Sequence, residues 1–117
     1  MPRFSIVIPT HDRGENGPVW MRELLDSLKI QTFQDFDIVV SDQSKNDKIL
    51  DTCKEYSEDF EFTYIRYEGE VPCENINIGL RECTGEIVKI MFSDDVFVDS
   101  NALQIINDTY TSTNCKW

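Results

Sequence analysis

Short apolar runs alternate along this chain with segments of helical periodicity. The runs are rich in β-branched and aromatic residues, which favours strands, and the first of them ends at Pro9. In the segments between them, apolar residues recur every three or four positions, as on an amphipathic helix. The predicted strands are residues 4–8, 36–40, 62–66 and 87–92, and the predicted helices are residues 18–30, 46–57, 73–83 and a last one capped by Asp99 or Ser100.

This alternation of strand and helix predicts βαβ units, and hence a largely parallel sheet with helices on both faces. The expected fold class is therefore α/β, a Rossmann-like α/β/α arrangement of three layers. Five of the six residues in the run 87–92 are apolar, so we expect that strand to be buried. Gly85 follows the third predicted helix, where a left-handed residue would end it. The apolar positions of the helices, Trp20 among them, are expected in the core.

The composition indicates one folded domain with an acidic surface. The chain has 117 residues, of which 40% are hydrophobic and 28% are charged, and this suffices for a single core over residues 1–117. The 11 basic and 22 acidic residues give a net charge of −11, which argues against a nucleic-acid binder. A phosphorylated ligand would then need a divalent cation between itself and the protein.

The cysteines and the single histidine argue against a zinc site. Cys53, Cys73, Cys83 and Cys115 form no C-x-x-C pair, and His11 is the one histidine. We find no signal peptide and no apolar stretch that approaches the ~20 residues of a membrane span. We therefore expect a cytoplasmic protein with reduced thiols and no transmembrane segment.

Polar residues that follow three of the predicted strands are the candidates for chemistry, because ligands of a parallel sheet bind beyond the carboxyl ends of its strands. Asp94 and Asp95 follow the fourth strand, and their hard oxygen atoms suit Mg²⁺ or Mn²⁺. The alternative is a solvated acidic turn. Asp42 follows the second strand and would either accept a hydrogen bond from a base or ribose, or simply turn the chain. His11 is equally open between an acid–base group and an ordinary loop residue.

Four segments together resemble the family 2 glycosyltransferases. Residues 4–13 are similar to the opening strand and loop of that family, residues 31–44 to its Gln-Thr-aromatic segment and following turn, residues 77–85 to its Asn-x-Gly segment, and residues 85–95 to the strand that carries its Asp-x-Asp metal motif. The resemblance implies a GT-A fold that binds a nucleotide-sugar donor, such as a UDP-sugar, through Mn²⁺ or Mg²⁺. It also implies inverting transfer of the sugar to an unknown acceptor.

The resemblance also implies a set of site residues. The donor-binding residues would be Pro9, Thr10, His11, Arg13, Asp42, Ser44, Asn77, Ser93 and Asp94, and the metal ligands would be Asp94 and Asp95. Thr10 would lie beside the base, Asp42 would bind its edge, and the aspartates would approach the ribose and the metal–diphosphate. The chain departs from the family pattern at His11, Ser41 and Gln43, and at Ile76, where many members carry an arginine.

In this family the acceptor site and the catalytic base lie beyond the metal motif. We therefore expect the chain to lack the acceptor-binding half, and we assign no catalytic base within it. Apolar surface near Ile105, Ile106 and Tyr110 would then be uncovered, and we predict a homo-oligomer. Two alternatives stay open at this point. One is a receiver-like signalling domain, and the other is a glycosyltransferase relic that no longer acts as an enzyme.

Overall fold

A computed structural model describes residues 2–12 and 16–113 of the chain, and these form four parallel strands and four helices. The strands pair in the order β3-β2-β1-β4, all of them parallel. The α/β fold class is confirmed. The elements are β1 (Phe4–Thr10), α1 (Gly17–Lys29), β2 (Phe36–Asp42), α2 (Lys48–Glu55), β3 (Phe62–Arg66), α3 (Pro72–Arg81), β4 (Ile87–Ile90) and α4 (Ala102–Thr113).

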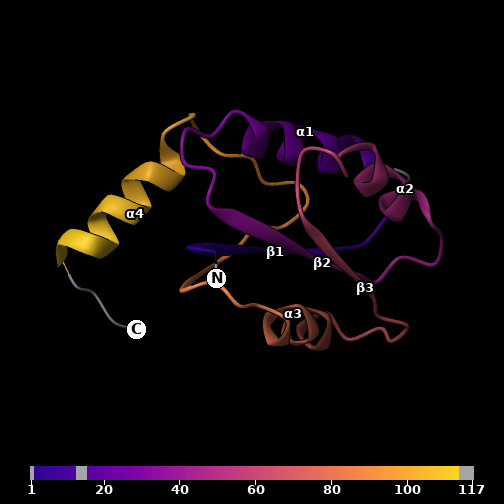
Figure 1. Cartoon of the computed structure of the whole chain (residues 1–117). Helices are drawn as coiled ribbons and strands as arrows, with labels where there is room; N and C mark the ends of the chain where they lie inside the picture. The colour runs from indigo at the N-terminus through magenta and orange to yellow at the C-terminus, as the bar shows by residue number, and fades with distance from the viewer. Residues whose placement is uncertain (1, 13–15, 114–117) are drawn as a thin grey trace.

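Strand β1 lies between β2 and β4, and all seven of its residues are buried. Phe4, Ile6 and Ile8 belong to the main apolar core. The alternate residues face the other way, and Val7 lies against Gly79 of α3. Figure 1 shows the resulting layers, with α1 and α2 over one face of the sheet and α3 over the other. The three-layer arrangement predicted from the sequence is therefore present.

Most apolar side chains of helix α1 pack into this core, but one that was predicted to do so does not. Met21, Leu24, Leu25 and Leu28 have no exposed surface. Trp20 is 36% exposed, so the prediction that it belongs to the core is wrong. One residue along a helix turns the side chain by about 100°, and the preceding position therefore points away from the sheet when Met21 points into it.

Strand β4 is an edge strand, and its expected burial is not found. Val88 and Ile90 are 42% and 37% exposed. They pair with Ser5 and Val7 on the face of the sheet that α3 covers. Helix α3 packs on β1 and β2, however, and leaves this part of the face open. Regular pairing also ends earlier than predicted, at Ile90.

Gly85 has a different role from the one expected. Its φ angle is not in the left-handed region, and α3 has already ended at Arg81. A Cβ atom at Gly85 would lie 2.5 Å from the Ser5 nitrogen and 2.6 Å from the Phe4 carbonyl carbon. The glycine therefore allows the chain to pass directly against β1, where Ser5 Oγ accepts a hydrogen bond from the Gly85 N–H at 2.9 Å.

Helix α4 is held at both ends by side chains from distant parts of the sequence. At its start, the buried Gln31 accepts a hydrogen bond from the Leu103 N–H at 3.1 Å and donates one to the Asp99 carbonyl at 2.8 Å. Towards its end, Arg3 donates to Asn107 and lies over the ring of Tyr110. These contacts attach α4 beside the sheet rather than across it (Figure 1).

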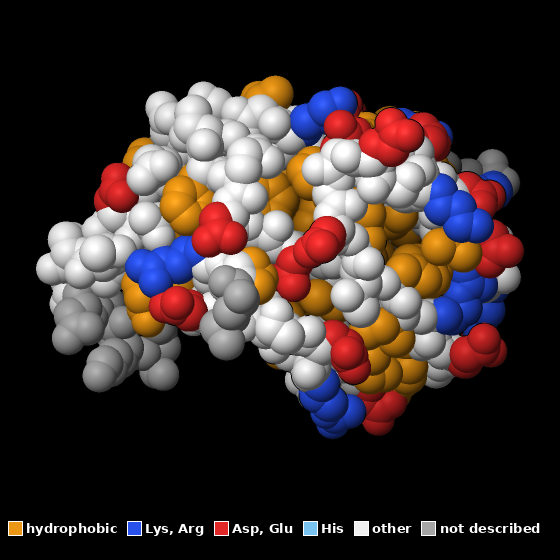
Figure 2. Space-filling view, viewed as in Figure 1, with side chains coloured by type: hydrophobic (Ala, Val, Ile, Leu, Met, Phe, Trp, Pro, Cys, Tyr) orange, Lys and Arg blue, Asp and Glu red, His pale blue; other side chains and the backbone are white. Residues whose placement is uncertain are grey.

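The acidic side chains are distributed over the surface. Figure 2 shows Asp and Glu side chains at many separate places on one face of the molecule. No helix in the described ranges is both long and apolar enough to cross a membrane.

The close passage at Gly85 predicts a position-specific loss of stability. Gly85→Ala should lower the free energy of unfolding by about 1–3 kcal/mol, since the methyl group meets backbone atoms that cannot move aside. Urea unfolding measures this. Gly69→Ala is the control, because the three atoms nearest its methyl group all belong to Tyr67, a half-exposed side chain that can rotate. Equal losses in the two variants would contradict the proposed role of Gly85.

The uncovered apolar side chains predict self-association. On α4 only Ile105 is strongly exposed, whereas Ile106 packs against the core and Tyr110 is covered by Arg3. The open row on β4 is therefore the better candidate for the surface that associates. Light scattering should show a concentration-dependent rise in mass that Ile90→Lys reduces. A strict monomer at high concentration would contradict this.

Candidate functional site

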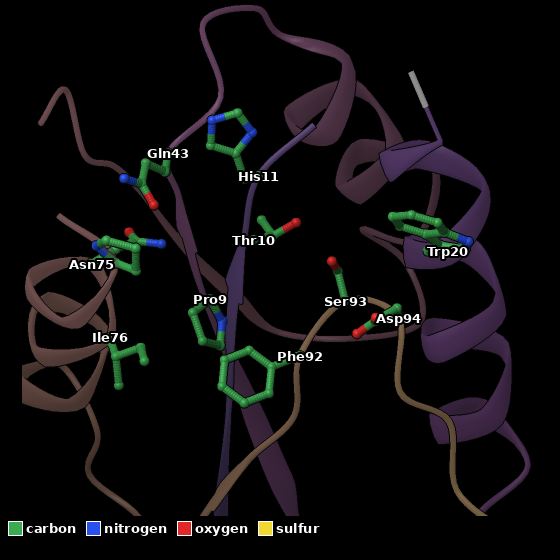
Figure 3. A pocket seen from close by; sticks show the side chains of 11 residues that line it. Pro9, Thr10, His11, Trp20, Gln43, Asn75, Ile76, Phe92, Ser93 and Asp94 are labelled. Atoms are coloured by element: carbon green, nitrogen blue, oxygen red, sulfur yellow. The ribbon is translucent and has the colours of Figure 1, made fainter. Parts of the chain in front are cut away.

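A cavity of about 500 Å³ lies at the carboxyl edge of the sheet, where β1 and β2 end. This volume is typical of small-molecule sites. Helix α1 contributes one wall, helix α3 the opposite wall, and the loop after β4 the third (Figure 3). Its lining residues are Pro9, Thr10, His11, Trp20, Gln43, Pro72, Asn75, Ile76, Phe92, Ser93 and Asp94.

Five of the predicted donor-binding residues line this cavity. They come from the end of β1 and from the loop after β4: Pro9, Thr10, His11, Ser93 and Asp94. The loops that follow these two strands thus meet, as the parallel sheet predicts. Arg13 lies outside the described residues. Asp42, Ser44, Asn77 and Asp95 do not line the cavity, and each has a different environment.

A tight turn after β4 decides which aspartate faces the cavity. The Asp95 N–H donates to the Phe92 carbonyl at 2.9 Å, and Asp95 Oδ2 accepts from the Phe92 N–H at 3.0 Å. Asp95 therefore closes the turn with both its backbone and its carboxylate. The two residues between them, Ser93 and Asp94, form the tip of this turn and line the cavity.

Asp42 is completely buried and its carboxylate is bound by the protein. Its Oδ1 accepts the Ser44 N–H at 2.9 Å, and its Oδ2 accepts the Tyr64 hydroxyl. The guanidinium of Arg66 lies 4.0 Å from Oδ2. In this structure the Asp42 side chain has no exposed surface and does not line the cavity, and its role at the edge of a base stays a prediction.

The surroundings of Asp42 influence the neighbouring titratable groups. Burial and the hydrogen bond to Asp42 raise the pKa of Tyr64, so its hydroxyl remains a donor at any physiological pH. Burial, with a smaller contribution from Asp42, raises the pKa of the Cys53 thiol to about 12. Neither group is therefore set up as a nucleophile or a base.

Ser44 acts behind the cavity wall rather than in it. Its Oγ accepts the Asp12 N–H at 2.7 Å, which ties the loop after β1 to the loop after β2. Asp12 Oδ1 in turn accepts the Gly17 N–H at 3.1 Å, at the first residue of α1. These hydrogen bonds link the buried Asp42 to the start of the helix that carries Trp20.

Helix α3 presents a different asparagine from the predicted one. Asn77 is exposed and lies beside Glu74, Ile78 and Arg81, outside the cavity. Asn75, which the sequence did not single out, is 2% exposed and lines the cavity. Two positions along a helix differ by about 200°, so the two asparagines face nearly opposite ways. Nothing in the local sequence distinguishes them.

The other residues missed by the sequence analysis are mostly apolar. Trp20, Pro72, Ile76 and Phe92 line the cavity together with the polar Gln43. Gln43 had a recognisable signal, since it lies in the polar cluster that follows the second predicted strand. Trp20 had none, because a tryptophan at helical spacing is more often part of a core.

Several polar atoms in the cavity wall are buried without a hydrogen-bond partner. They are Thr10 Oγ1, His11 Nδ1 and Asn75 Oδ1. An unsatisfied buried polar group costs about 1–3 kcal/mol, and such groups need an explanation. A ligand that supplied the missing hydrogen bonds would remove this cost. Asp37 Oδ1 and Ser41 Oγ, which do not line the cavity, are buried without a partner as well.

The carboxylates are suited to a divalent cation that completes its shell from elsewhere. Among the residues that the structure describes, no three His, Cys, Asp or Glu side chains gather as a ready-made metal site. Asp94 lines the cavity, and the neighbouring Asp95 still has Oδ1 free of any hydrogen bond to Phe92. Mg²⁺ and similar ions often bind one or two carboxylates and take their remaining ligands from water and substrate phosphates. This donor set fits that mode.

Residues 5–113 match the family model for glycosyl transferase family 2. The chain belongs to this family. The match covers the described strands and helices and the cavity that they form. It confirms the resemblance seen in the four sequence segments, and it argues against the alternative that the chain is a receiver-like signalling domain.

Curated relatives of the chain are glycosyltransferases of greater length. A β-1,3-glucosyltransferase of Campylobacter jejuni, named for the substrate GalNAc(5)-diNAcBac-PP-undecaprenol, is 28% identical over 98% of this chain. The glycosyltransferase GlyA of Streptococcus pneumoniae is 32% identical over 80% of it. The chain spans only 38% and 13% of the lengths of these two proteins.

Solved structures of glycosyltransferases share this fold. S. aureus TarS 1–349 in complex with UDP superposes with a TM-score of 0.83 and is 26% identical, over 96% of this chain and 33% of that one. The mannosyltransferase PcManGT of Pyrobaculum calidifontis superposes with a TM-score of 0.72 at 24% identity, over 87% of this chain and 30% of that one. The second likeness concerns the fold alone.

The buried environment of Asp42 predicts that its hydroxyl partner matters for stability. Tyr64→Phe should lower the free energy of unfolding by about 1–3 kcal/mol, because it leaves a buried carboxylate oxygen without its donor. Tyr67→Phe removes the hydrogen bond of Tyr67 to Glu74, which is exposed, and should have a much smaller effect. Chemical denaturation of both variants measures the difference, and equal losses would refute this view of Asp42.

Proposed function

We propose that this domain binds a nucleotide-sugar donor, with UDP as the nucleotide, through a divalent cation, for transfer of the sugar to an acceptor. The observation that carries the proposal is the cavity at the carboxyl edge of the sheet, which Asn75 lines on one side, Thr10 in the middle and Asp94 on the other side (Figure 3). Membership of glycosyl transferase family 2 and the likeness to TarS in complex with UDP support this choice of ligand.

The two ends of the cavity suit the two ends of a nucleoside diphosphate. In Figure 3, Asn75, Gln43 and His11 lie on one side, and Trp20 and Asp94 lie on the other. Neutral donors and acceptors suit a nucleobase, whose edge carries partial charges only. A carboxylate suits the cation that accompanies a diphosphate. We therefore place the base towards α3 and the diphosphate towards the turn after β4.

Charge explains why the cation would be needed. No lysine or arginine is found among the described residues that line the cavity. Lys45 and Arg66 lie nearby, but they are paired with Glu70 and Asp47. A diphosphate would thus meet Asp94 in a protein of net charge −11. A bound Mn²⁺ or Mg²⁺ would neutralise the diphosphate and assist its departure as a leaving group.

The reaction beyond donor binding is part of the same proposal. Direct displacement with inversion at the anomeric carbon is what the family resemblance implies, and the identity of the acceptor and of the base is open. A relic that binds a donor without transferring it would bind UDP but release no sugar from UDP-sugars.

Cys53, Cys73 and Cys83 are free thiols, which supports our proposal of a cytoplasmic location.

The metal dependence of UDP binding tests the proposal. Calorimetric titration of the chain with UDP should give an affinity at least ~10-fold higher in Mn²⁺ than in EDTA, equivalent to ~1.4 kcal/mol. Asp94→Asn should abolish that gain. Asp95→Asn should also abolish it, because the amide oxygen can still close the turn on Phe92 while the charge is lost.

The control for charge is Asp108→Asn. Asp108 lies on α4, is bound to Gln104 and does not line the cavity, so this variant changes the net charge equally and should keep the metal effect. Equal UDP affinity in Mn²⁺ and in EDTA would show that Asp94 and Asp95 form only a solvated turn. No binding of UDP in either condition would refute the donor site itself.

A further inference from the structure

We infer that Gln31 is a positioning residue for the divalent cation. It holds the end of the segment that carries Asp94 and Asp95, and it thereby raises the affinity of the cavity for a nucleotide in the presence of the metal. The inference rests on the proposed function, because it requires a cation at these two carboxylates. Gln31 does not line the cavity, so it acts through the backbone of that segment.

The two aspartates lie in a segment that has no regular structure of its own. Residues 91–101 connect β4 to α4 and contain neither helix nor strand. At the start of this segment, the Met91 N–H donates to the Val7 carbonyl at 2.8 Å, which holds it to β1. The turn with the aspartates comes next. Beyond the turn, Val96 and Val98 are 51% and 97% exposed, so these two side chains hold the segment weakly.

Gln31 holds the other end of this segment. Its Nε2 donates to the Asp99 carbonyl at 2.8 Å and to the Ser27 carbonyl at 3.2 Å, and its Oε1 accepts the Leu103 N–H at 3.1 Å. If the amide turned over, its oxygen would face two carbonyls and its NH₂ group would face an N–H, so only one orientation satisfies all three partners. Gln31 is 3% exposed. One buried side chain therefore joins the end of α1, the segment after β4 and the start of α4.

Fixing both ends of the segment favours the cation. An ion that takes two carboxylates from one turn, and its other ligands from water and phosphate, binds more tightly when that turn is ordered beforehand. With Gln31 present, the turn lies between two fixed points, Met91 and Asp99. Without Gln31 the second point is lost, and the segment must be ordered when the cation binds.

Replacement of Gln31 should therefore weaken the metal effect specifically. In Gln31→Ala, the ratio of UDP affinity in Mn²⁺ to that in EDTA should fall by about tenfold, the lower end of what loss of an outer partner costs a metal site. The affinity in EDTA should stay within about twofold of the wild-type value, because the cavity wall is unchanged. A residue that served overall stability alone would change both affinities equally. Calorimetric titration measures both.

The variant keeps other attachments of helix α4. The Thr32 N–H still donates to the Ser100 carbonyl at 2.8 Å, and Arg3 still donates to Asn107 at 2.7 Å. We therefore expect Gln31→Ala to fold, with a lower midpoint of thermal unfolding, and the titrations are made below that midpoint.

Gln34→Ala is the matched control. The amide of Gln34 donates to the carbonyls of Leu28, Lys29 and Gln31, all at the end of α1. Its replacement removes the same chemical group from the same region but leaves the Asp99 carbonyl bound to Gln31. Gln34→Ala should keep the full metal effect. An equal fall of the ratio in the two variants would overturn the role of Gln31.

Hydrogen exchange of the wild-type chain gives a test that needs no variant. If the attachment at Gln31 favours the cation, the bound cation must stabilise this attachment in return. At saturating UDP, the Leu103 amide should exchange at least about threefold more slowly in Mn²⁺ than in EDTA. The Phe60 amide, which donates to the Tyr56 carbonyl at 3.1 Å beyond the end of α2, should change less. Equal changes at the two amides would overturn the inference.

The titrations separate this inference from the proposed function. If the wild-type chain binds UDP equally well in Mn²⁺ and in EDTA, the proposed metal site is refuted, and the role of Gln31 with it. If the wild-type chain shows the metal effect and Gln31→Ala retains it in full, only the role of Gln31 is refuted.

Discussion

The buried carboxylate of Asp42 is the interaction on which the geometry of the cavity depends. A charged group without exposed surface is stable in a protein only when hydrogen bonds replace its lost hydration. Here the Ser44 N–H and the Tyr64 hydroxyl provide them, and Arg66 lies nearby. These partners come from the loop after β2 and from β3, so satisfying the charge also fixes how the ends of the two strands meet.

A series of hydrogen bonds connects Asp42 to the walls of the cavity and helps to position them. Ser44, held by Asp42, accepts the Asp12 N–H, and Asp12 accepts the N–H of the first residue of α1. The start of α1 is thereby positioned relative to the sheet, and with it Trp20. On the opposite side, Asn75 donates to the Ser41 carbonyl, the residue directly before Asp42. Hydrogen bonds thus connect both walls of the cavity to the end of β2.

In the described part of the chain, three buried side-chain atoms without a hydrogen-bond partner belong to residues that line the cavity, and two others, Asp37 Oδ1 and Ser41 Oγ, belong to β2 outside it. Asp42, Ser44 and Gln31 are buried polar residues whose hydrogen bonds are made within the protein. Thr10 and Asn75 are buried to a similar degree, yet each has an atom with no partner. A ligand in the cavity could supply partners only near the residues that line it, Thr10, His11 and Asn75.

The sequence by itself determined the order of strands and helices, the α/β class and the edge at which polar residues gather. These follow from periodicity and from the geometry of parallel strands, which act locally and need no knowledge of distant contacts. Strand β3 has the predicted bounds, and α1 is displaced by a single residue. Only the tertiary structure decided which side chains reach the cavity. Asn75 faces it and Asn77 does not, because the packing of α3 on β1 and β2 sets the rotation of that helix. Asp94 lines the cavity, while Asp95 closes a turn. Asp42 accepts a hydrogen bond from Tyr64, a residue 22 positions away in the sequence. Such choices depend on contacts between residues remote in sequence, and no local pattern records them.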